Sequence, residues 1–231
     1  MDEIKNNEEN IAEPVSFMSR IVNVFIAPKK AMKIAGEQPL ILGLLVVLAI
    51  SALVIYIPQR PMFLKMTMTA IENSKETLSA EEIDLLLSGG ANAAMFMSMF
   101  YFIFTPLFKG LVVYALSVLL GGAGKLKASL GIVMNAYMIM VLGQALRMII
   151  VLATGNPYFS FSPAIFLPAG QETTSLFSLL SAVDLFVVWY LAVGMIGVQL
   201  LQKLNPIKSF LVVFGPWIMM LTFGILGVGG L

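Results

Sequence analysis

Three ionisable side chains interrupt the long apolar stretches of this sequence, and their chemistry is the first question it raises. They are Lys109, Arg147 and Asp184. A charge at the centre of a membrane helix costs about 2.5–3.5 kcal/mol on insertion scales, so each one needs a partner or a task. An arginine and a carboxylate can satisfy each other through two parallel hydrogen bonds, whereas a lone lysine suits a polar path or a freed backbone carbonyl.

The positions of Arg147 and Asp184 predict that these two side chains meet. At 1.5 Å per residue, Arg147 lies about 9 Å and Asp184 about 12 Å inside the same end of two consecutive apolar runs. Gln144 precedes Arg147 by one helical turn and can join the same network. We interpret the three as a structural intramembrane pair with a supporting amide. The alternatives are a substrate- or proton-handling role, and misplaced span boundaries that would leave either charge at the membrane interface.

Lys109 follows Pro106 in the second apolar run. Proline removes a backbone donor and bends a helix, which frees a carbonyl nearby. Lys109 is therefore expected to point at such a carbonyl, to line a water-filled crevice or to extend toward Asp184, and the sequence leaves these three open. Together, Lys109, Arg147 and Asp184 would also suit a polar path through a small transporter or channel.

The composition excludes much of the usual chemistry. The chain has no Cys and no His, which rules out a thiolate nucleophile, an imidazole base, a haem-binding His and a Cys/His zinc site. A net charge of +1 without a basic stripe argues against a nucleic-acid partner. We expect no enzymatic activity, no metal and no cofactor.

The stretches that hold these charges are long enough to cross a bilayer. A helix needs about 20 apolar residues to span a hydrocarbon core of about 30 Å, in which every backbone polar group must find an internal partner. With 59% hydrophobic and 12% charged residues, the chain is expected to be an all-α polytopic membrane protein, a bundle of five transmembrane helices with an N-terminal interfacial amphipathic helix. The predicted spans are Pro39–Ile57, Ala93–Leu120, Ala128–Ala153, Leu176–Leu201 and Ile207–Val228.

Polar segments divide the rest of the chain. Residues 1–14 are expected to be a disordered acidic tail, residues 15–36 an interfacial amphipathic segment, and residues 37–231 the membrane domain, with one sizeable external loop at 58–92. The basic side chains of the interfacial segment are expected to contact the lipid surface; the alternative is that this segment packs on the end of the bundle. These side chains are Arg20, Lys29, Lys30 and Lys33.

The distribution of Lys and Arg predicts the topology. Basic residues gather in the interfacial segment and in the second and fourth breaks between spans, whereas the loop at 154–175 has none. An excess of Lys and Arg in short loops marks the cytoplasmic side. We therefore expect a plasma-membrane protein with a cytoplasmic N-terminus and an external C-terminus.

The external loop contains a helix-start signal and an apolar face. Ser79 and Glu82 form a capping box, and the helix they start is expected to end at Gly89–Gly90. Methionine-rich faces adapt to different binding partners, so we predict a partner-docking loop just upstream; packing over the outer mouth of the bundle is the alternative. The residues of this face are Met62, Phe63, Met66 and Met68.

The glycine-rich segment 121–127 superficially suggests a phosphate-binding loop. Lys125 is followed by Leu126 rather than by Ser or Thr, and Leu119 stands where the first glycine is required. We interpret the segment as a glycine turn between two spans.

Several short motifs lie in a fixed order around the predicted spans. They run from Asn23–Lys30 and Gln38–Pro39, through Leu120–Lys127 and Asn135–Tyr137, to Asp184–Trp189 followed by Gly194 and Gly197. In this order they resemble the bacterial branch of the Yip (Ypt-interacting protein) domain family, over about residues 20–228. The resemblance implies a five-helix membrane domain with a cytoplasmic N-terminus and no catalytic or cofactor-binding residue. Eukaryotic relatives bind Rab-type GTPases and shape vesicle membranes.

Some bacterial members of this family are extra membrane subunits of ABC-type efflux transporters. The length and the Met-rich outer loop are similar to those of the YknW-type subunit, which belongs to an exporter that protects against a toxic peptide. We therefore expect a non-enzymatic accessory or scaffold protein whose partners are membrane lipids and other integral membrane proteins, an ABC efflux permease among them. The alternatives are a small transporter or channel and a membrane-shaping protein that acts through the basic interfacial helix.

Overall fold

The chain folds into helices joined by short turns and two longer loops. The computed structural model describes residues 16–74, 78–168, 170–172 and 174–228, and every regular element in those ranges is helical, which confirms the all-α prediction. The tail predicted at 1–14 lies outside the described residues. The elements are α1 (Phe17–Ile26), α2 (Pro28–Glu37), α3 (Ile41–Tyr56), η1 (Ile57–Gln59), α4 (Arg60–Asn73), α5 (Ala80–Leu119), α6 (Leu126–Ala136), α7 (Met138–Thr154), η2 (Pro163–Phe166), α8 (Ser175–Ala182), α9 (Leu185–Gln202) and α10 (Pro206–Val228).

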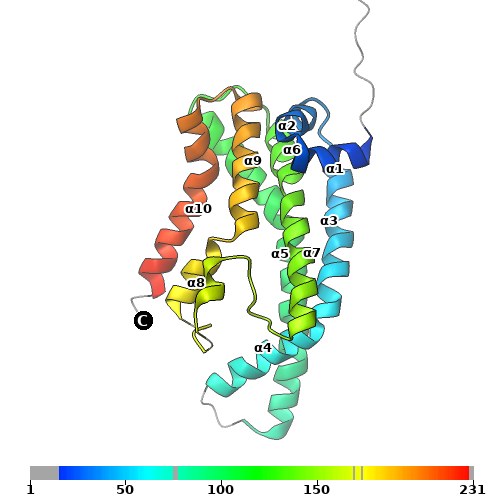
Figure 1. Cartoon of the computed structure of the whole chain (residues 1–231), viewed down its shortest axis with the longest axis vertical. Coiled ribbons are helices and arrows are strands. Elements are labelled where there is room, and N and C mark those ends of the chain that lie inside the picture. The colour runs from blue at the N-terminus through cyan, green and yellow to red at the C-terminus, as the bar shows by residue number, and fades with distance from the viewer. Residues whose placement is uncertain (1–15, 75–77, 169, 173, 229–231) are drawn as a thin grey trace, which may run out of the picture.

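Five helical stretches of the described chain are long and apolar enough to cross a membrane, as the sequence predicts. Figure 1 shows α3, α5, α7, α9 and α10 running along the long axis of the molecule. We call one end of this bundle the basic end: it holds α1, α2 and the turns at 120–125 and 203–205. The opposite end holds α4 and the first turns of α5, and we call it the hairpin end (Figure 1).

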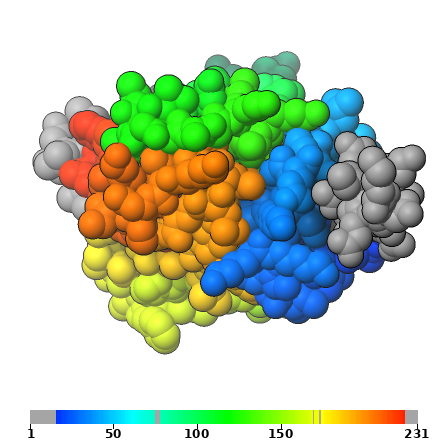
Figure 2. Space-filling model, turned by 90° about the horizontal axis from the view of Figure 1, so that it is seen from above, coloured from blue at the N-terminus to red at the C-terminus, as the bar shows by residue number. Residues whose placement is uncertain are grey.

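At the basic end, the N-terminal amphipathic segment predicted from the sequence consists of two helices. Ser16 caps α1 by accepting a hydrogen bond from the Ser19 N–H, and Pro28 takes the first position of α2, where its missing N–H costs nothing. α2 packs against α6 and α9 and buries Met32 and Ile34. Figure 2 looks onto this end and shows the blue α1–α2 segment beside the orange end of α9.

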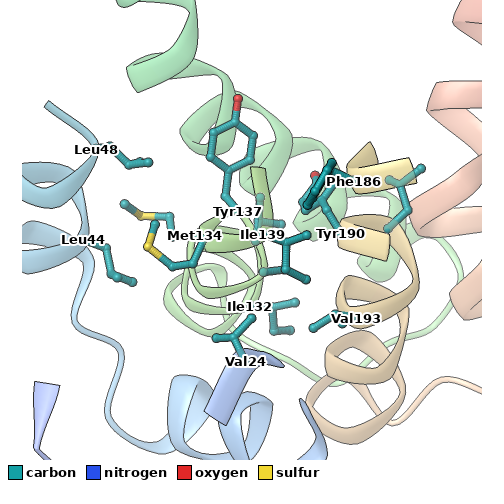
Figure 3. Close-up of a cluster of buried hydrophobic side chains, with 14 of the residues drawn as sticks. Val24, Leu44, Leu48, Ile132, Met134, Tyr137, Ile139, Phe186, Tyr190 and Val193 are labelled. Carbon is teal, nitrogen blue, oxygen red and sulfur yellow. The ribbon is translucent and has the colours of Figure 1, made fainter. Parts of the chain in front are cut away.

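The core is centred on the chain around the α6–α7 junction. Residues 131–139 are all buried, so this helix is enclosed on every side. Gly131 has no room for a Cβ, which would collide with the carbonyl oxygen of Ala35 in α2. Figure 3 shows α6 and α7 residues inserted between those of α3 and α9; the labelled side chains are Val24, Leu44, Leu48, Ile132, Met134, Tyr137, Ile139, Phe186, Tyr190 and Val193.

α5 differs from its prediction in one respect. The capping box at Ser79 and Glu82 is confirmed, since the Ser79 hydroxyl accepts from the Glu82 N–H and the Glu82 carboxylate accepts from the Ser79 N–H. The prediction that Gly89–Gly90 ends this helix is wrong, because α5 runs unbroken for 40 residues. The small residue at 90 lets α4 approach, since a Cβ there would lie 3.2 Å from the methyl carbon of Thr67.

The start of the fourth span is also corrected. The sequence places it at Leu176, but α8 is a separate short helix, and the spanning helix α9 begins at Leu185. The break occurs at Val183 and Asp184 because the Asp184 side chain caps α9 instead of continuing a helix from α8.

Candidate functional site

Arg147 binds the backbone of the loop that follows its own helix. Gly155 ends α7 in the left-handed conformation (φ 67°), so the chain turns back along the helix. The Arg147 Nε donates to the Phe159 carbonyl and Nη2 donates to the Pro157 carbonyl, both at 2.7 Å. The guanidinium therefore fixes the returning loop at two points.

Asp184 holds the other end of the same loop. One carboxylate oxygen accepts from the Phe186 N–H at 2.8 Å and caps α9, while the other accepts from the Phe161 N–H at 3.1 Å. The Leu185 N–H returns a hydrogen bond to the Phe161 carbonyl at 2.9 Å. Burial raises the pKa of the Asp184 carboxyl above its ordinary value, whereas the backbone donors and the charge of Arg147 act in the opposite direction.

The structure thus joins Arg147 to Asp184 through the loop at 157–161 and not through a direct fork. The only ion pair within the described ranges is the one between Lys33 and Glu37. Gln144 is half-buried and forms no hydrogen bond with another described residue. Counted along the helices from the basic end, Arg147 lies about 32 Å and Asp184 about 27 Å down, which puts both near the far boundary of a hydrocarbon core of about 30 Å.

Lys109 stands apart from this arrangement. It lies about 15 Å from the end of α5 at Leu119, near the middle of the hydrocarbon core. Its Nζ sits 5.0 Å from the centroid of the Tyr190 ring, a cation–π distance, and it lines a cavity that Arg147 and Asp184 do not line. Lys109 does not extend to Asp184; it lines a mostly apolar cavity, and the water-filled crevice stays a prediction. The three charges therefore do not form one continuous path.

Three of the four basic side chains predicted to contact the lipid surface are exposed at the basic end. Lys29, Lys30 and Lys33 are exposed, and the Lys33 Nζ lies 3.8 Å from the Glu37 carboxylate. Arg20 is placed differently, because its guanidinium donates to the backbone and side-chain oxygens of Gln38 at 2.6 and 2.5 Å. Arg20 therefore ties α1 to the turn between α2 and α3.

The predicted docking residues divide into two groups. Met62 and Phe63 are partly buried, and the Phe63 ring lies 6.4 Å from the Tyr56 ring, so they pack against the bundle. Met66 and Met68 are both exposed on α4. Sequence reasoning missed Leu85 and Leu86 on the facing helix, which are 72% and 46% exposed.

A second feature missed from the sequence is a buried polar contact at the basic end. The Gln202 side-chain amide donates to the Ser129 hydroxyl at 2.5 Å, and the Ala123 N–H donates to the Gln202 carbonyl at 3.0 Å. Gly124 is required where the turn crosses this amide, because a Cβ would collide with it. Gln202 and Ser129 lie far apart in the sequence, in mostly apolar helices, so the sequence does not indicate that they meet. The glycine turn itself was predicted.

One comparison with known proteins identifies a relationship. The family model described as the Yip1 domain matches residues 22–227, which is nearly all of the described chain. No curated protein and no solved structure matches the sequence.

Proposed function

The chain belongs to the Yip1 domain family, and from this membership we propose that it is a non-enzymatic accessory protein that binds another integral membrane protein through its hairpin end. We propose an ABC-type efflux permease as the partner and the plasma membrane, with the basic end in the cytoplasm, as the location. The observation that carries the proposal is the exposed apolar surface of the hairpin end.

The length of α5 supports this role. Its 40 residues extend about 60 Å, twice the thickness of the hydrocarbon core. Counted back from Leu119, about 20 residues of α5 span a core of about 30 Å, which reaches to about residue 99. The first turns of α5, which begin at Ala80, therefore extend beyond the core. α4 crosses this end of the bundle and packs against those turns (Figure 1).

The two helices of this extension expose four large apolar side chains among charged residues. We call the exposed set on its two helices the hairpin surface. Exposed apolar groups outside a membrane commonly mark a protein–protein contact, and methionine adapts to a partner's shape. The set consists of Met66, Met68, Leu85 and Leu86.

The charged residues support an architectural role over a catalytic one. Two nitrogens of Arg147 and one oxygen of Asp184 bind backbone groups of the same loop, and the other oxygen of Asp184 caps α9. Groups held in this way stabilise the loop and the start of α9. The choice of a permease rests on the resemblance drawn from the chain's length and its Met-rich outer loop.

Site-specific photocrosslinking in cells tests the proposal. A photoreactive residue at Met68 or Leu85 is expected to give one discrete crosslink to the same membrane protein. Leu53 on α3 and Leu211 on α10, whose exposed fractions lie between those of Met68 and Leu85, serve as lipid-facing controls. Hairpin positions that crosslink no more protein than Leu53 would refute docking, whereas a discrete product other than an ABC permease would refute only the partner's identity.

A membrane-shaping role has its own supporting observation at the basic end. Met18, Val22 and Ile26 form one exposed apolar stripe along α1, next to the exposed lysines of α2. An apolar stripe beside basic residues is typical of a helix lying in the interface of an anionic membrane. Full-length protein in nanodiscs tests it: a cysteine at Val22 should be protected from maleimide more strongly when anionic lipid is present, and replacing all three lysines by glutamine should abolish that difference.

A further inference from the structure

A cavity of about 470 Å³ lies between α5, α6, α9 and α10. Its size falls within the range of about 300–1,000 Å³ that is usual for small-molecule sites. Its rim consists of exposed apolar side chains on the outer faces of α5 and α10, where Phe104, Phe108 and Met220 are 47%, 69% and 59% exposed. The cavity therefore opens sideways toward the bilayer and not toward either end of the bundle.

One face of this apolar cavity carries a polar row. Tyr101, Thr105 and Lys109 are four residues apart on α5, which places them on the same side of the helix, and all three line the cavity. Tyr190 faces them from α9 with its ring 5.0 Å from the Lys109 Nζ. A binding site of this kind, mostly apolar with a few convergent polar groups, recognises a molecule that is mostly apolar with one polar head.

The charge of Lys109 sets the sign of that head. Its ammonium lies about 15 Å from the end of α5, at the depth where an unpaired charge is most costly. Among the described residues no carboxylate lies within ion-pair distance of it, and neither Lys109 nor Thr105 makes a side-chain hydrogen bond. The Tyr190 ring offers attraction to a cation but supplies no negative charge. An anionic group of a ligand would supply the negative charge that the Lys109 ammonium lacks.

We infer that this cavity binds a single-chain anionic amphiphile from the bilayer, with its carboxylate or phosphate head against Lys109 and its hydrocarbon chain along the apolar walls. The sideways opening gives access from lipid, and a molecule of drug size fits the volume better than a two-chain lipid does. The cation–π contact holds the ammonium in place when the site is empty. This site shares no residue with the hairpin surface, so the inference does not depend on the proposed docking.

Trp217 lines the cavity and provides a direct reporter. The chain has two tryptophans, so Trp189→Phe leaves Trp217 as the only one. Full-length Trp189→Phe protein in detergent is titrated with dibrominated stearate, with dibrominated lysophosphatidate, and with the neutral dibrominated alcohol. We expect saturable quenching by the anionic probes, and the preferred probe distinguishes a carboxylate from a phosphate head.

Substitutions at Lys109 decide whether the charge matters. Lys109→Gln should raise the apparent dissociation constant for the anionic probe about tenfold, as loss of a charge-assisted contact implies, and leave the neutral alcohol unaffected. Lys109→Arg should restore binding, and Lys125→Gln, which removes an exposed charge at the basic end, is the matched control. Quenching that does not saturate, or that is the same in Lys109→Gln, would overturn the inference.

A second variant tests the volume without changing the charge. Gly194 lines the cavity, and a Cβ there would meet Val213 at an ordinary 3.6 Å, so a larger side chain can enter the space. Gly194→Leu should weaken binding of all three probes while the protein remains monodisperse in gel filtration. Unchanged binding in a folded Gly194→Leu protein would place the ligand elsewhere and contradict the inference.

Discussion

Replacing Arg147 with leucine removes both hydrogen bonds that hold the returning loop to α7, at 2.7 Å each. Hydrogen bonds to charged groups contribute about 1.5–3 kcal/mol in soluble proteins, and those measured inside membrane proteins average about 0.6 kcal/mol. Arg147 is half-buried near the membrane boundary, so we take about 0.6–1.5 kcal/mol per bond, and the two bonds together give a loss of about 1–3 kcal/mol in the free energy of unfolding. The buried residue Pro157 is left with an unpaired carbonyl, which adds to the cost.

Unfolding in mixed micelles of dodecyl maltoside and SDS, followed by tryptophan fluorescence, measures this loss. Arg147→Lys keeps the charge but reaches one carbonyl at a time, so its stability should fall between wild type and Arg147→Leu. Ile149→Leu, on the exposed face of the same helix, is the control and should change little. If the free energies of unfolding of Arg147→Leu and wild type differ by less than about 0.3 kcal/mol, the role assigned to the guanidinium is refuted.

Substitutions at four further positions can be measured by the same unfolding assay. Gly124→Ala should lower the free energy of unfolding by about 1–3 kcal/mol because its methyl group enters the space of the Gln202 amide. Gly215→Ala has open space around it and should raise the free energy of unfolding by about 0.5–1 kcal/mol. The opposite order of stabilities would contradict the packing at the basic end. Asp184→Ala should lower the free energy of unfolding by about 1–2 kcal/mol through loss of the α9 cap and the loop contact. Asp184→Asn keeps one acceptor oxygen, so its stability should lie between those of Asp184→Ala and wild type. Equal stability of wild type and both variants would exclude the cap. Lys203→Gly should stabilise by up to about 1 kcal/mol because residue 203 has a φ of 54°, and a loss of stability there would count against that backbone geometry.

The spans and the capping box were predictable because their signals are local. The length of an apolar run decides whether a helix crosses the membrane, and Ser79 and Glu82 lie one turn apart. The continuation of the loop helix through Gly89–Gly90 into the second span was not predictable, since glycine weakens a helix by only about 1 kcal/mol and the packing of α4 outweighs it.

The partners of the charged residues needed the tertiary structure. Arg147 binds carbonyl oxygens, and a backbone carbonyl has no signature in the sequence, so pairing with the nearest carboxylate was the natural prediction. Asp184 lies in an apolar run that reads equally well as one long helix or as a break with a cap. Lys109 and Tyr190 come from α5 and α9, and only the packing of the two helices shows that they meet.

Single cysteines at the two ends of the bundle provide the most direct test of the central claim, that a five-span bundle presents the hairpin end outside the cell and the basic end inside. The chain has no native Cys, so each substitution creates a unique label site. Ser88 and Glu81 serve at the hairpin end, and Lys30 and Lys125 at the basic end; all four are exposed. We predict that a membrane-impermeant maleimide labels positions 81 and 88 on intact cells and reaches positions 30 and 125 only after permeabilisation. Labelling of both ends from the same side, or of the basic end alone on intact cells, would contradict it.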